Sequence, residues 1–499
     1  MASWVRWLAG FLALPGVASA QPYVVVGPSA FAPAARPLLE ARKAQGLAPL
    51  WIELDAQLAG DARALAARIH AEIGKTKTPG YLLLLGDSDR GKAPLPTLSR
   101  PGLQSLVPGM PGKQRVWSDL GFVDPQDSGS PTWAIGRIPA RDAEQVATVV
   151  AKILAYEKIA PGPWVRELEL VAGDGDFGVV IDTVLNGALR QLFAEELAPG
   201  FALGALIALP DSPFFASPPT FGQEVRNRLD AGPFALVYAG HGWIDRFADL
   251  RLRGQPGAWP ILRTDDVAKL EHAERSIVLA WACHIGEFPR EALGEVLLRA
   301  PHGPVAVVAA SEVSFPFGDF VLGRELMRAQ EDLGITRLGD LVKVSKQRAL
   351  HPDPTDKFGK RAALLAGLMG LDADQQQELR RYTADLYHLL GDPALLLPAR
   401  GKLDVQVEGR ATLAIPLVVQ IGGSADAGIG RVWVELCKDR GQDPRDVLLA
   451  TEVEAQGGRA RVTLPWPKDA QPGQAIVRVQ ATTPGRFWFG GKRFRVFRE

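Results

Sequence analysis

The sequence contains very little cysteine. Only Cys283 and Cys437 occur in 499 residues, so a dense disulfide framework cannot hold the fold together. Cys437 ends an alternating apolar stretch at 432–437 that is typical of a strand, and we expect it to be a small buried residue. Cys283 instead follows the continuous apolar run 277–282. A lone thiol at the end of such a run indicates a chemical role.

The chain also lacks an excess of charge of either sign. Lys plus Arg and Asp plus Glu number 56 each, which gives no reason to expect a nucleic acid or an acidic polymer as a partner. With 47% hydrophobic and 22% charged residues, the composition is that of an ordinary globular protein. The length predicts roughly two to four domains.

Hydrophobic runs long enough to cross a bilayer are missing too. The apolar stretch at 7–17 is too short for this, and glycine and proline interrupt it. Arg6 precedes the stretch and Ala-Ser-Ala follows it at 18–20, which is typical of a signal peptide cleaved after residue 20. We therefore predict a signal peptide at 1–20 and a secreted, periplasmic or cell-surface protein. An integral membrane protein is not expected.

Short apolar runs alternate with helical stretches from Tyr23 onward. This alternation predicts parallel strands connected by helices that cover both faces of a sheet. A break at 160–163 divides the region into an N-terminal α/β subdomain at 21–163 and a second one at 164–400. In the first, we expect helices over 34–45, 61–73 and 142–157. In the second, we expect helices over 179–196, 265–272 and 289–298.

The composition changes near residue 400. Beyond it, short alternating strands follow one another, separated by glycine and proline turns. Six or seven strands in ~100 residues predict a small β-sandwich of the immunoglobulin kind over 401–499.

Two reactive side chains follow buried strands. His241 comes after the apolar run 234–239, and Cys283 after 277–282. Ligands meet open α/β sheets at the carboxyl ends of such strands, so the two groups are expected side by side. A cysteine thiolate is a nucleophile, and an imidazole can act as its general base and acid. Gly242 lets its N–H approach an oxyanion together with the N–H of Cys283.

Other interpretations of these residues remain open. Cys283 could be a buried thiol and His241-Gly242 a simple turn. A zinc site of Cys283, His284 and His241 lacks a fourth ligand at the usual spacing, so no metal is expected. His284 is also a rival base, but neighbours on a strand point to opposite faces, and we expect it to face away from Cys283.

Several motifs together resemble the gingipain family of caspase-like cysteine peptidases. The resemblance covers about 375 residues and rests on Tyr23-Val-Val-Val, Tyr81-Leu-Leu-Leu-Leu-Gly-Asp87, Ala134-Ile-Gly-Arg-Ile-Pro139, Tyr238-Ala-Gly-His-Gly242, Ala282-Cys283 and Leu390-Gly-Asp-Pro393. It implies an α/β fold, a caspase-like three-layer sandwich in two subdomains, followed by the immunoglobulin-like domain. It also implies a secreted endopeptidase acting on proteins or peptides without a cofactor. Cys283 is then the nucleophile, His241 the base, and the Gly242 and Cys283 amides the oxyanion hole.

The chain departs from this family at two acidic positions. Ala151, next to Lys152, stands where Arg-preferring gingipains have an acid, so a basic P1 side chain is not implied. The third catalytic carboxylate of the family is expected at Asp142 or Glu144. Asp142 is equally suited to cap a helix, and Glu144 to lie in its first turn. Asp119 resembles another acidic family position, with a loop role as the alternative.

Four further residues are expected to line a substrate pocket, with a packed connecting loop as the alternative: Trp243, Ser311, Ser314 and Phe315. Asp174 and Asp176 could hold calcium, although the segment lacks the other ligands of a known loop and a turn is favoured.

Two alternatives to hydrolysis follow from the same residues. An amine could replace water and make the enzyme a sortase-like transpeptidase. The chain could also be a non-catalytic adhesin or scaffold whose C-terminal domain binds a surface or secretion partner.

Overall fold

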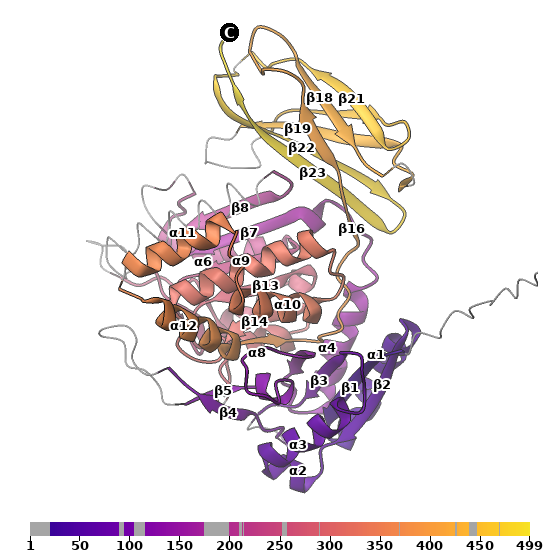
Figure 1. Ribbon diagram of the computed structural model, residues 1–499, viewed down its shortest axis with the longest axis vertical. Helices are drawn as coiled ribbons and strands as arrows, with labels where there is room; N and C mark the ends of the chain where they lie inside the picture. Colours follow the sequence, from indigo (N-terminus) through magenta and orange to yellow (C-terminus); the bar gives the residue numbers. More distant parts are fainter. Residues whose placement is uncertain are drawn as a thin grey trace, which may run out of the picture.

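A computed structural model describes most of the chain, namely residues 20–88, 94–103, 115–173, 199–208, 212, 214–251, 257–288, 290–368, 370–424, 427–438, 447–468 and 470–499. The signal peptide predicted at 1–20 lies almost entirely outside the described residues, as does the helix expected at 179–196. A large α/β part and a smaller β part are visible in Figure 1.

One ten-stranded sheet forms the centre of the α/β part. Its strands lie in the order β2 (Leu47–Glu53), β1 (Gln21–Gly27), β3 (Tyr81–Leu85), β6 (Ala134–Ile138), β15 (Tyr387–Leu390), β14 (Ala306–Ala310), β13 (Ile277–Trp281), β9 (Ala235–Ala239), β7 (Glu167–Ala172) and β8 (Ala202–Ile207). Most of these strands are buried on both faces, which explains their continuous apolar runs.

The sheet consists of two parallel halves that run in opposite directions. All its strand pairs are parallel except β14 with β15, which is antiparallel. The carboxyl ends of β13 and β9 therefore lie at one edge of the sheet, and those of β6, β3 and β1 at the opposite edge. Residues that follow β9 and β13 therefore lie at the opposite edge of the sheet from residues that follow β6.

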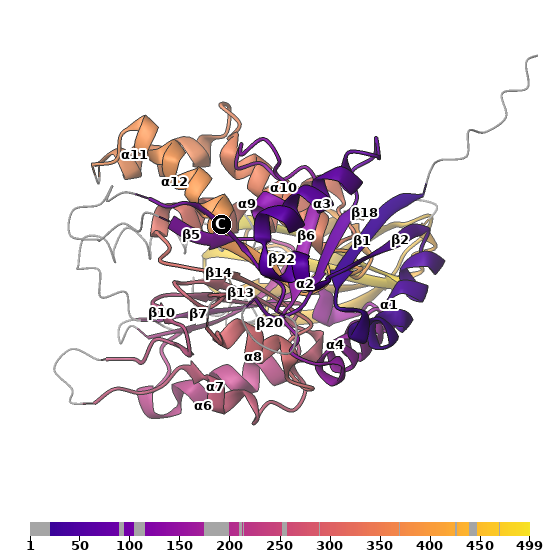
Figure 2. The same cartoon turned by 90° about the horizontal axis from the view of Figure 1, so that it is seen from below.

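Helices cover both faces and make three layers (Figure 2). One face carries α3 (Ala62–Ile73), α9 (Pro316–Leu333), α10 (Leu338–Leu350) and α12 (Ala373–Leu386), with α11 (Lys357–Leu368) outside them. The other face carries α1 (Ala32–Ala44), α4 (Ala143–Tyr156), α6 (Pro218–Asp230), α7 (Thr264–Val267) and α8 (Leu293–Arg299). The caspase-like three-layer arrangement expected from the sequence is confirmed.

Strand β1 shows how alternate residues supply both cores. Val24 and Val26 pack with Leu65 of α3 on one face. Tyr23 and Val25 belong to the larger core on the other face. Side chains on a strand alternate between faces, so a fully apolar run is needed where both faces are covered.

Two of the helices expected from the sequence are shorter than predicted. The helix predicted at 265–272 is only the four-residue α7, because the backbone N–H groups of Glu271 and His272 donate to the Asp230 carboxylate at 2.9 and 3.0 Å. The helix predicted at 289–298 begins at Leu293, whose N–H donates to the carbonyl of Ile244. In both cases a tertiary hydrogen bond replaces helical pairing.

The C-terminal part is a sandwich of two sheets. One sheet has the order β16 (Arg400–Lys402), β23 (Arg486–Val496), β22 (Gly473–Thr483), β19 (Arg431–Lys438) and β20 (Val447–Glu454), and the other β17 (Asp404–Val407), β18 (Leu417–Gly422) and β21 (Arg459–Leu464). A separate hydrophobic core fills the space between them. The predicted β-sandwich is therefore present.

Buried charges and aromatic rings join the sandwich to the α/β part. Glu435 of β19 accepts hydrogen bonds from Arg166 at 3.0 Å and from Arg478 at 3.1 Å. Arg400 lies 3.9 Å above the ring of Phe234, and its guanidinium donates to the carbonyl of Val165 at 2.7 Å. Both arginines paired with Glu435 are buried, so these contacts belong to the packed interior.

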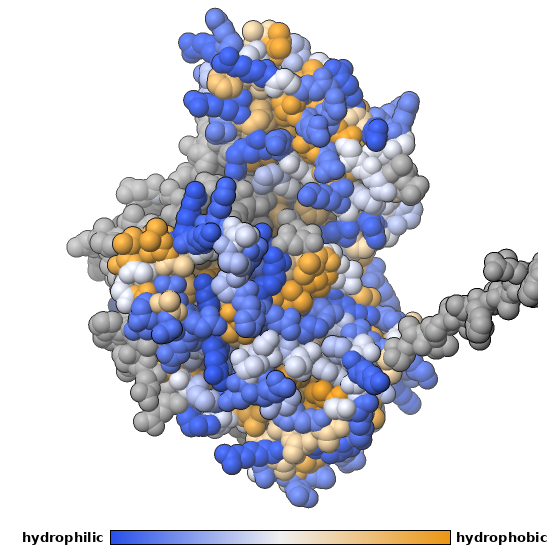
Figure 3. Space-filling model, in the orientation of Figure 1, coloured by the Kyte–Doolittle hydropathy of each residue, from blue (hydrophilic) through white to orange (hydrophobic). Residues whose placement is uncertain are grey.

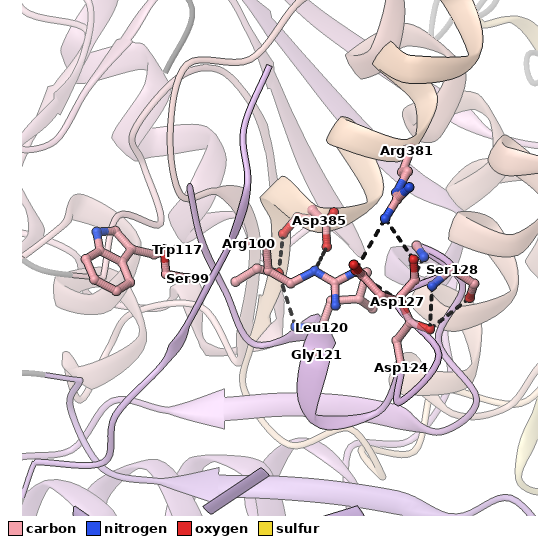
Figure 4. A network of polar contacts seen from close by, with 12 residues as sticks. Ser99, Arg100, Trp117, Leu120, Gly121, Asp124, Asp127, Ser128, Arg381 and Asp385 are labelled. Carbon is pink, nitrogen blue, oxygen red and sulfur yellow. Dashed lines mark hydrogen bonds and ion pairs between the residues drawn. The ribbon is translucent and has the colours of Figure 1, made fainter. Parts of the chain in front are cut away.

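A polar network ties the hairpin of β4 (Leu98–Pro101) and β5 (Arg115–Ser118) to α12 (Figure 4). Arg100 lies 2.7 Å from Asp385 of α12, and it also pairs with Asp124 at 3.1 Å and Asp127 at 2.8 Å. Burial raises the pKa of Asp385 to about 6, and Arg100 opposes that rise. The hairpin thus connects the N-terminal half of the sheet to a helix of the C-terminal half.

The surface seen in Figure 3 is mostly hydrophilic, with hydrophobic patches over α11 and between polar residues of the sandwich. Leu364 and Leu368 of α11 are exposed. Within the described ranges, no helix combines the length and the apolar character that crossing a membrane requires.

Candidate active site

His241 and Cys283 follow neighbouring parallel strands. Ala239, the last residue of β9, pairs with Trp281, the last residue of β13. The N–H of Gly240 then donates to the carbonyl of Trp281 at 3.3 Å. Both reactive residues stand two positions beyond these strand ends, so they lie at the same edge of the sheet, as the sequence predicted.

Gly242 brings the two segments into direct contact. A Cβ atom at this position would lie only 2.3 Å from the carbonyl oxygen of Cys283, and 2.9 Å from the Cβ of Ala282. Real Cβ atoms do not approach backbone this closely, so only glycine allows the segments to pack as they do. The backbone that carries the imidazole thus rests against the backbone that carries the thiol.

The main chain of His241 is held firmly in place. Its carbonyl accepts the Tyr238 hydroxyl at 2.6 Å and the N–H of Ala248 at 3.0 Å. The Tyr238 ring in turn stacks on Phe247, with ring centroids 3.8 Å apart. Short strands β10 (Gly242–Trp243) and β11 (Arg246–Phe247) form the hairpin that follows the histidine.

The Cys283 sulfur is partly buried against the loop after β14. The N–H of Ser314 donates to the sulfur at 3.3 Å, and the Ser314 carbonyl and hydroxyl oxygens lie 3.8 and 3.9 Å from it. Burial raises the pKa of the Cys283 thiol, which the hydrogen bond from Ser314 opposes. The neutral thiol is therefore favoured, and a thiol becomes a good nucleophile only after a base has taken its proton.

His284 is held by carboxylates. It sits in a turn with left-handed backbone, at φ 61°, and its Nδ1 lies 2.8 Å from Glu287 and 3.4 Å from Glu312. Strand alternation, on which the predicted direction of His284 depends, does not apply here because the backbone at this point is a turn. The acidic pair fixes one ring nitrogen of His284.

Asp142 and Glu144 lie at the start of α4, after β6. The Asp142 carboxylate accepts the N–H of Gln145 at 2.9 Å and caps the helix. Glu144 is exposed in the first turn. Because β6 runs opposite to β13, this helix start lies at the sheet edge opposite to that of Cys283. The structure does not bring these two carboxylates to the histidine.

Other acidic and basic positions singled out from the sequence have structural contacts. Asp119 is buried and forms a bidentate pair with Arg137, at 2.7 and 2.8 Å. Lys152 is buried in α4 and donates to the carbonyls of Leu298 and Ala300 at the end of α8. Burial lowers the pKa of Lys152 to about 7. Its neighbour Ala151 is exposed.

The four residues expected to line a pocket differ in exposure. Trp243 is 58% exposed next to Gly242. Ser311 is fully buried and donates to the carbonyl of Trp117 at 2.7 Å. Phe315 packs edge to face against Tyr382, with centroids 5.9 Å apart. Ser314 contacts the Cys283 sulfur, so Trp243 is the one of the four that presents most of its side chain to solvent.

Two residues behind the Cys283 sulfur have no signal in the sequence. Asp319 lies in the first turn of α9 and accepts the Ser314 hydroxyl at 2.7 Å. Tyr387 starts β15, and its hydroxyl also donates to Asp319, at 2.8 Å. An acid in a first helical turn and a tyrosine in an apolar strand look ordinary in the sequence. Only the pairing of β14 with β15 brings them together.

No group of three or more His, Cys, Asp or Glu side chains that could hold a metal ion occurs in the part of the chain that the structure describes. The calcium site considered at Asp174 and Asp176 falls outside those residues.

Comparisons with known proteins show the family and the fold of the chain. The family model of peptidase family C25 matches residues 18–398. The fold is similar to the crystal structure of the Arg-specific cysteine proteinase gingipain R, with a TM-score of 0.54 and 15% sequence identity over 96% of this chain and 98% of that one. A second structure, of a protease, gives a TM-score of 0.55 and 17% identity over the same shares. No curated protein matches the sequence. The match over most of its length shows that the chain belongs to peptidase family C25, the gingipain family of cysteine-type peptidases.

Proposed function

We propose that this peptidase is an exported endopeptidase in which Cys283 is the nucleophile and His241 is the general base and acid. The observation that carries the proposal is the contact between their two segments, where Gly242 lies against the Cys283 carbonyl. The alignment of β9 with β13 supports it. Membership of a peptidase family favours this function over a non-catalytic scaffold.

In the proposed reaction, His241 takes the proton of the Cys283 thiol as the sulfur attacks the peptide carbonyl carbon. The N–H groups of Gly242 and Cys283 stabilise the resulting oxyanion. The imidazolium then protonates the departing amine, which leaves a thioester on the sulfur. Water, activated by the neutral imidazole, hydrolyses the thioester and restores the thiol. The third catalytic carboxylate stays unassigned, because Asp142 and Glu144 lie at the other edge of the sheet.

We further propose that residues 21–163 and 164–400 form one catalytic unit, since they share a continuous sheet. Residues 401–499 form an accessory domain that could contact a surface or secretion partner. Export rests on the signal peptide predicted at 1–20.

Activity-based labelling tests the proposal directly. Purified wild type should be labelled by a peptidyl acyloxymethyl ketone on Cys283 and should cleave a mixed peptide library at internal bonds. Both labelling and cleavage should fall by at least ~1,000-fold in Cys283→Ala and in His241→Ala, because these residues form one catalytic unit. The matched control is Cys437→Ala, which removes the other cysteine and should leave labelling unchanged.

Full cleavage by the Cys283→Ala variant would refute the assignment of the nucleophile. Adding an amine such as a glycine peptide separates hydrolysis from transfer. Ligated products in place of hydrolysed ones would replace the endopeptidase with the transpeptidase.

A further inference from the structure

A chain of hydrogen bonds runs from the Cys283 sulfur to a buried carboxylate. The Ser314 N–H donates to the sulfur at 3.3 Å, and the Ser314 hydroxyl, 3.9 Å from that sulfur, donates to Asp319 at 2.7 Å. The hydroxyl of Tyr387 donates to the other oxygen of Asp319 at 2.8 Å. Three elements therefore meet behind the nucleophile: the loop after β14, the start of α9 and the start of β15.

The carboxylate of this network is sheltered from water. Ser314 is 6% exposed, Asp319 9% and Tyr387 1%. The contacts of Asp319 within the described chain are two hydroxyl donors, with no basic partner, and burial raises its pKa to about 7. Burying a carboxylate without a cation lowers the stability of the fold. Such groups are common at functional sites, which points to a role for Asp319.

The Ser314 hydroxyl has a single proton, which it can donate either to Asp319 or to the Cys283 sulfur. While Asp319 is ionised, this proton is engaged with the carboxylate, and the sulfur is stabilised mainly by backbone N–H groups, that of Ser314 first. If the group at position 319 donates instead, the hydroxyl is released and can turn its proton toward the sulfur. A thiolate gains from each additional donor, because hydrogen bonding to the charged form lowers a pKa.

We propose that Asp319 is a positioning residue that acts through the Ser314 hydroxyl: it orients this hydroxyl and thereby controls how strongly the Cys283 thiolate is stabilised. The proposal rests on the proposed role of Cys283. The titratable groups that face the network are Cys283 itself, Tyr382 and Tyr387, with Glu312 beside Tyr382. Tyr382 and Tyr387 are hydroxyl groups, and the Glu312 carboxylate accepts the N–H of Val313 at 3.2 Å. Asp319 is the carboxylate that accepts the hydroxyl protons of Ser314 and Tyr387.

The variant Asp319→Asn tests the proposal. Tyr387 donates to one oxygen of residue 319, so the amide NH2 of the variant faces Ser314 and donates to its hydroxyl oxygen. The hydroxyl is then free to donate to the sulfur, and a negative charge is removed as well. We expect the midpoint of the pH profile for iodoacetamide alkylation of Cys283 to fall by about one pH unit.

A second background separates the hydroxyl from the charge. In Ser314→Ala the hydroxyl is absent, so adding Asp319→Asn should move the alkylation midpoint by less than half as much as it does in wild type. Ser314→Thr keeps a hydroxyl and should restore the full shift. An equal shift with and without the hydroxyl would mean that Asp319 acts through its charge alone, and would overturn the proposal. So would the absence of any shift in Asp319→Asn.

The matched control is Asp340→Asn. Asp340 also accepts a tyrosine hydroxyl, that of Tyr81, but it lies in α10 and not behind the sulfur. It should leave the alkylation profile unchanged, and thermal denaturation of each variant checks folding. Alkylation is read on Cys283 by mass spectrometry and needs no peptidase activity. If Cys283→Ala still hydrolysed peptides, the proposed function would fail, while the alkylation series would still decide the network.

Discussion

At the scale of single residues, the site depends on a missing side chain. Gly242 has no Cβ, and this lets the segment of His241 lie against the carbonyl of Cys283. Glycine is thus required here for close approach of two backbones, which is one of its recurring uses. The neighbouring backbone is fixed by the Tyr238 hydroxyl, so the segments cannot easily move apart.

We expect Gly242→Ala to lower kcat/KM by at least ~100-fold, because the added methyl group pushes the imidazole segment away from the sulfur. The same overpacking should cost about 1 to 3 kcal/mol of stability. Peptide hydrolysis and thermal denaturation measure the two effects. Gly430→Ala is the control, since no atom lies within 4 Å of its added Cβ. Wild-type activity in Gly242→Ala would show that the close approach is not needed.

At the scale of elements, helices α4 and α8 are joined through a buried lysine. Lys152 of α4 donates to the carbonyls of Leu298 at 2.6 Å and Ala300 at 2.9 Å, which belong to the last turn of α8 and the residue after it. Donors at a helix end satisfy carbonyls that have no partner within the helix. The cost is that a cation is kept away from water.

This cost should appear in the pH dependence of stability. Burial lowers the pKa of Lys152 to about 7, whereas an unfolded lysine titrates near ~10.4. Between these values the unfolded state binds more protons, so the free energy of unfolding contributed by Lys152 rises with pH. Urea denaturation between pH 7 and 9 should give a steeper rise for wild type than for Lys152→Met. The exposed control Lys269→Met should follow wild type, and equal slopes for wild type and Lys152→Met would contradict this account.

At the scale of the whole molecule, one acidic side chain joins the sandwich to the α/β part. Glu435 pairs with Arg166 from η3 (Pro163–Arg166), which precedes β7, and with Arg478 of the sandwich. Removing one partner of a buried group of charges leaves the others without compensation. Such a loss is costly, whereas an exposed pair contributes little.

We expect Glu435→Gln to lower the free energy of unfolding by about 3 to 5 kcal/mol, since the buried guanidinium of Arg166 loses the carboxylate with which it pairs. Denaturant titration followed by tryptophan fluorescence would measure this change. Glu452→Gln is the matched control on the same sheet, because its pair with Arg431 is more than half exposed on both sides, at 52% and 68%. If Glu435→Gln and the control were equally stable, Glu435 would not be the residue that stabilises the contact between the two parts.

The strands and the neighbours at the reactive edge could be predicted from the sequence alone. Continuous apolar runs before His241 and Cys283 predicted buried parallel strands, and β9 does pair with β13. The reason is that a strand covered on both faces needs apolar residues at consecutive positions, which are visible in the sequence. A parallel crossover also places successive strands close together.

The residues that surround the sulfur, in contrast, depend on long-range packing. Strand β15 enters the middle of the sheet antiparallel to β14, which puts Asp142 at the far edge and brings Tyr387 to Asp319. The periodicity of apolar residues does not predict the direction of β15, because this direction depends on how segments far apart in the chain pack into one sheet. The contacts of Cys283 therefore follow from the whole fold, whereas its place at a strand end follows from the residues next to it in the sequence.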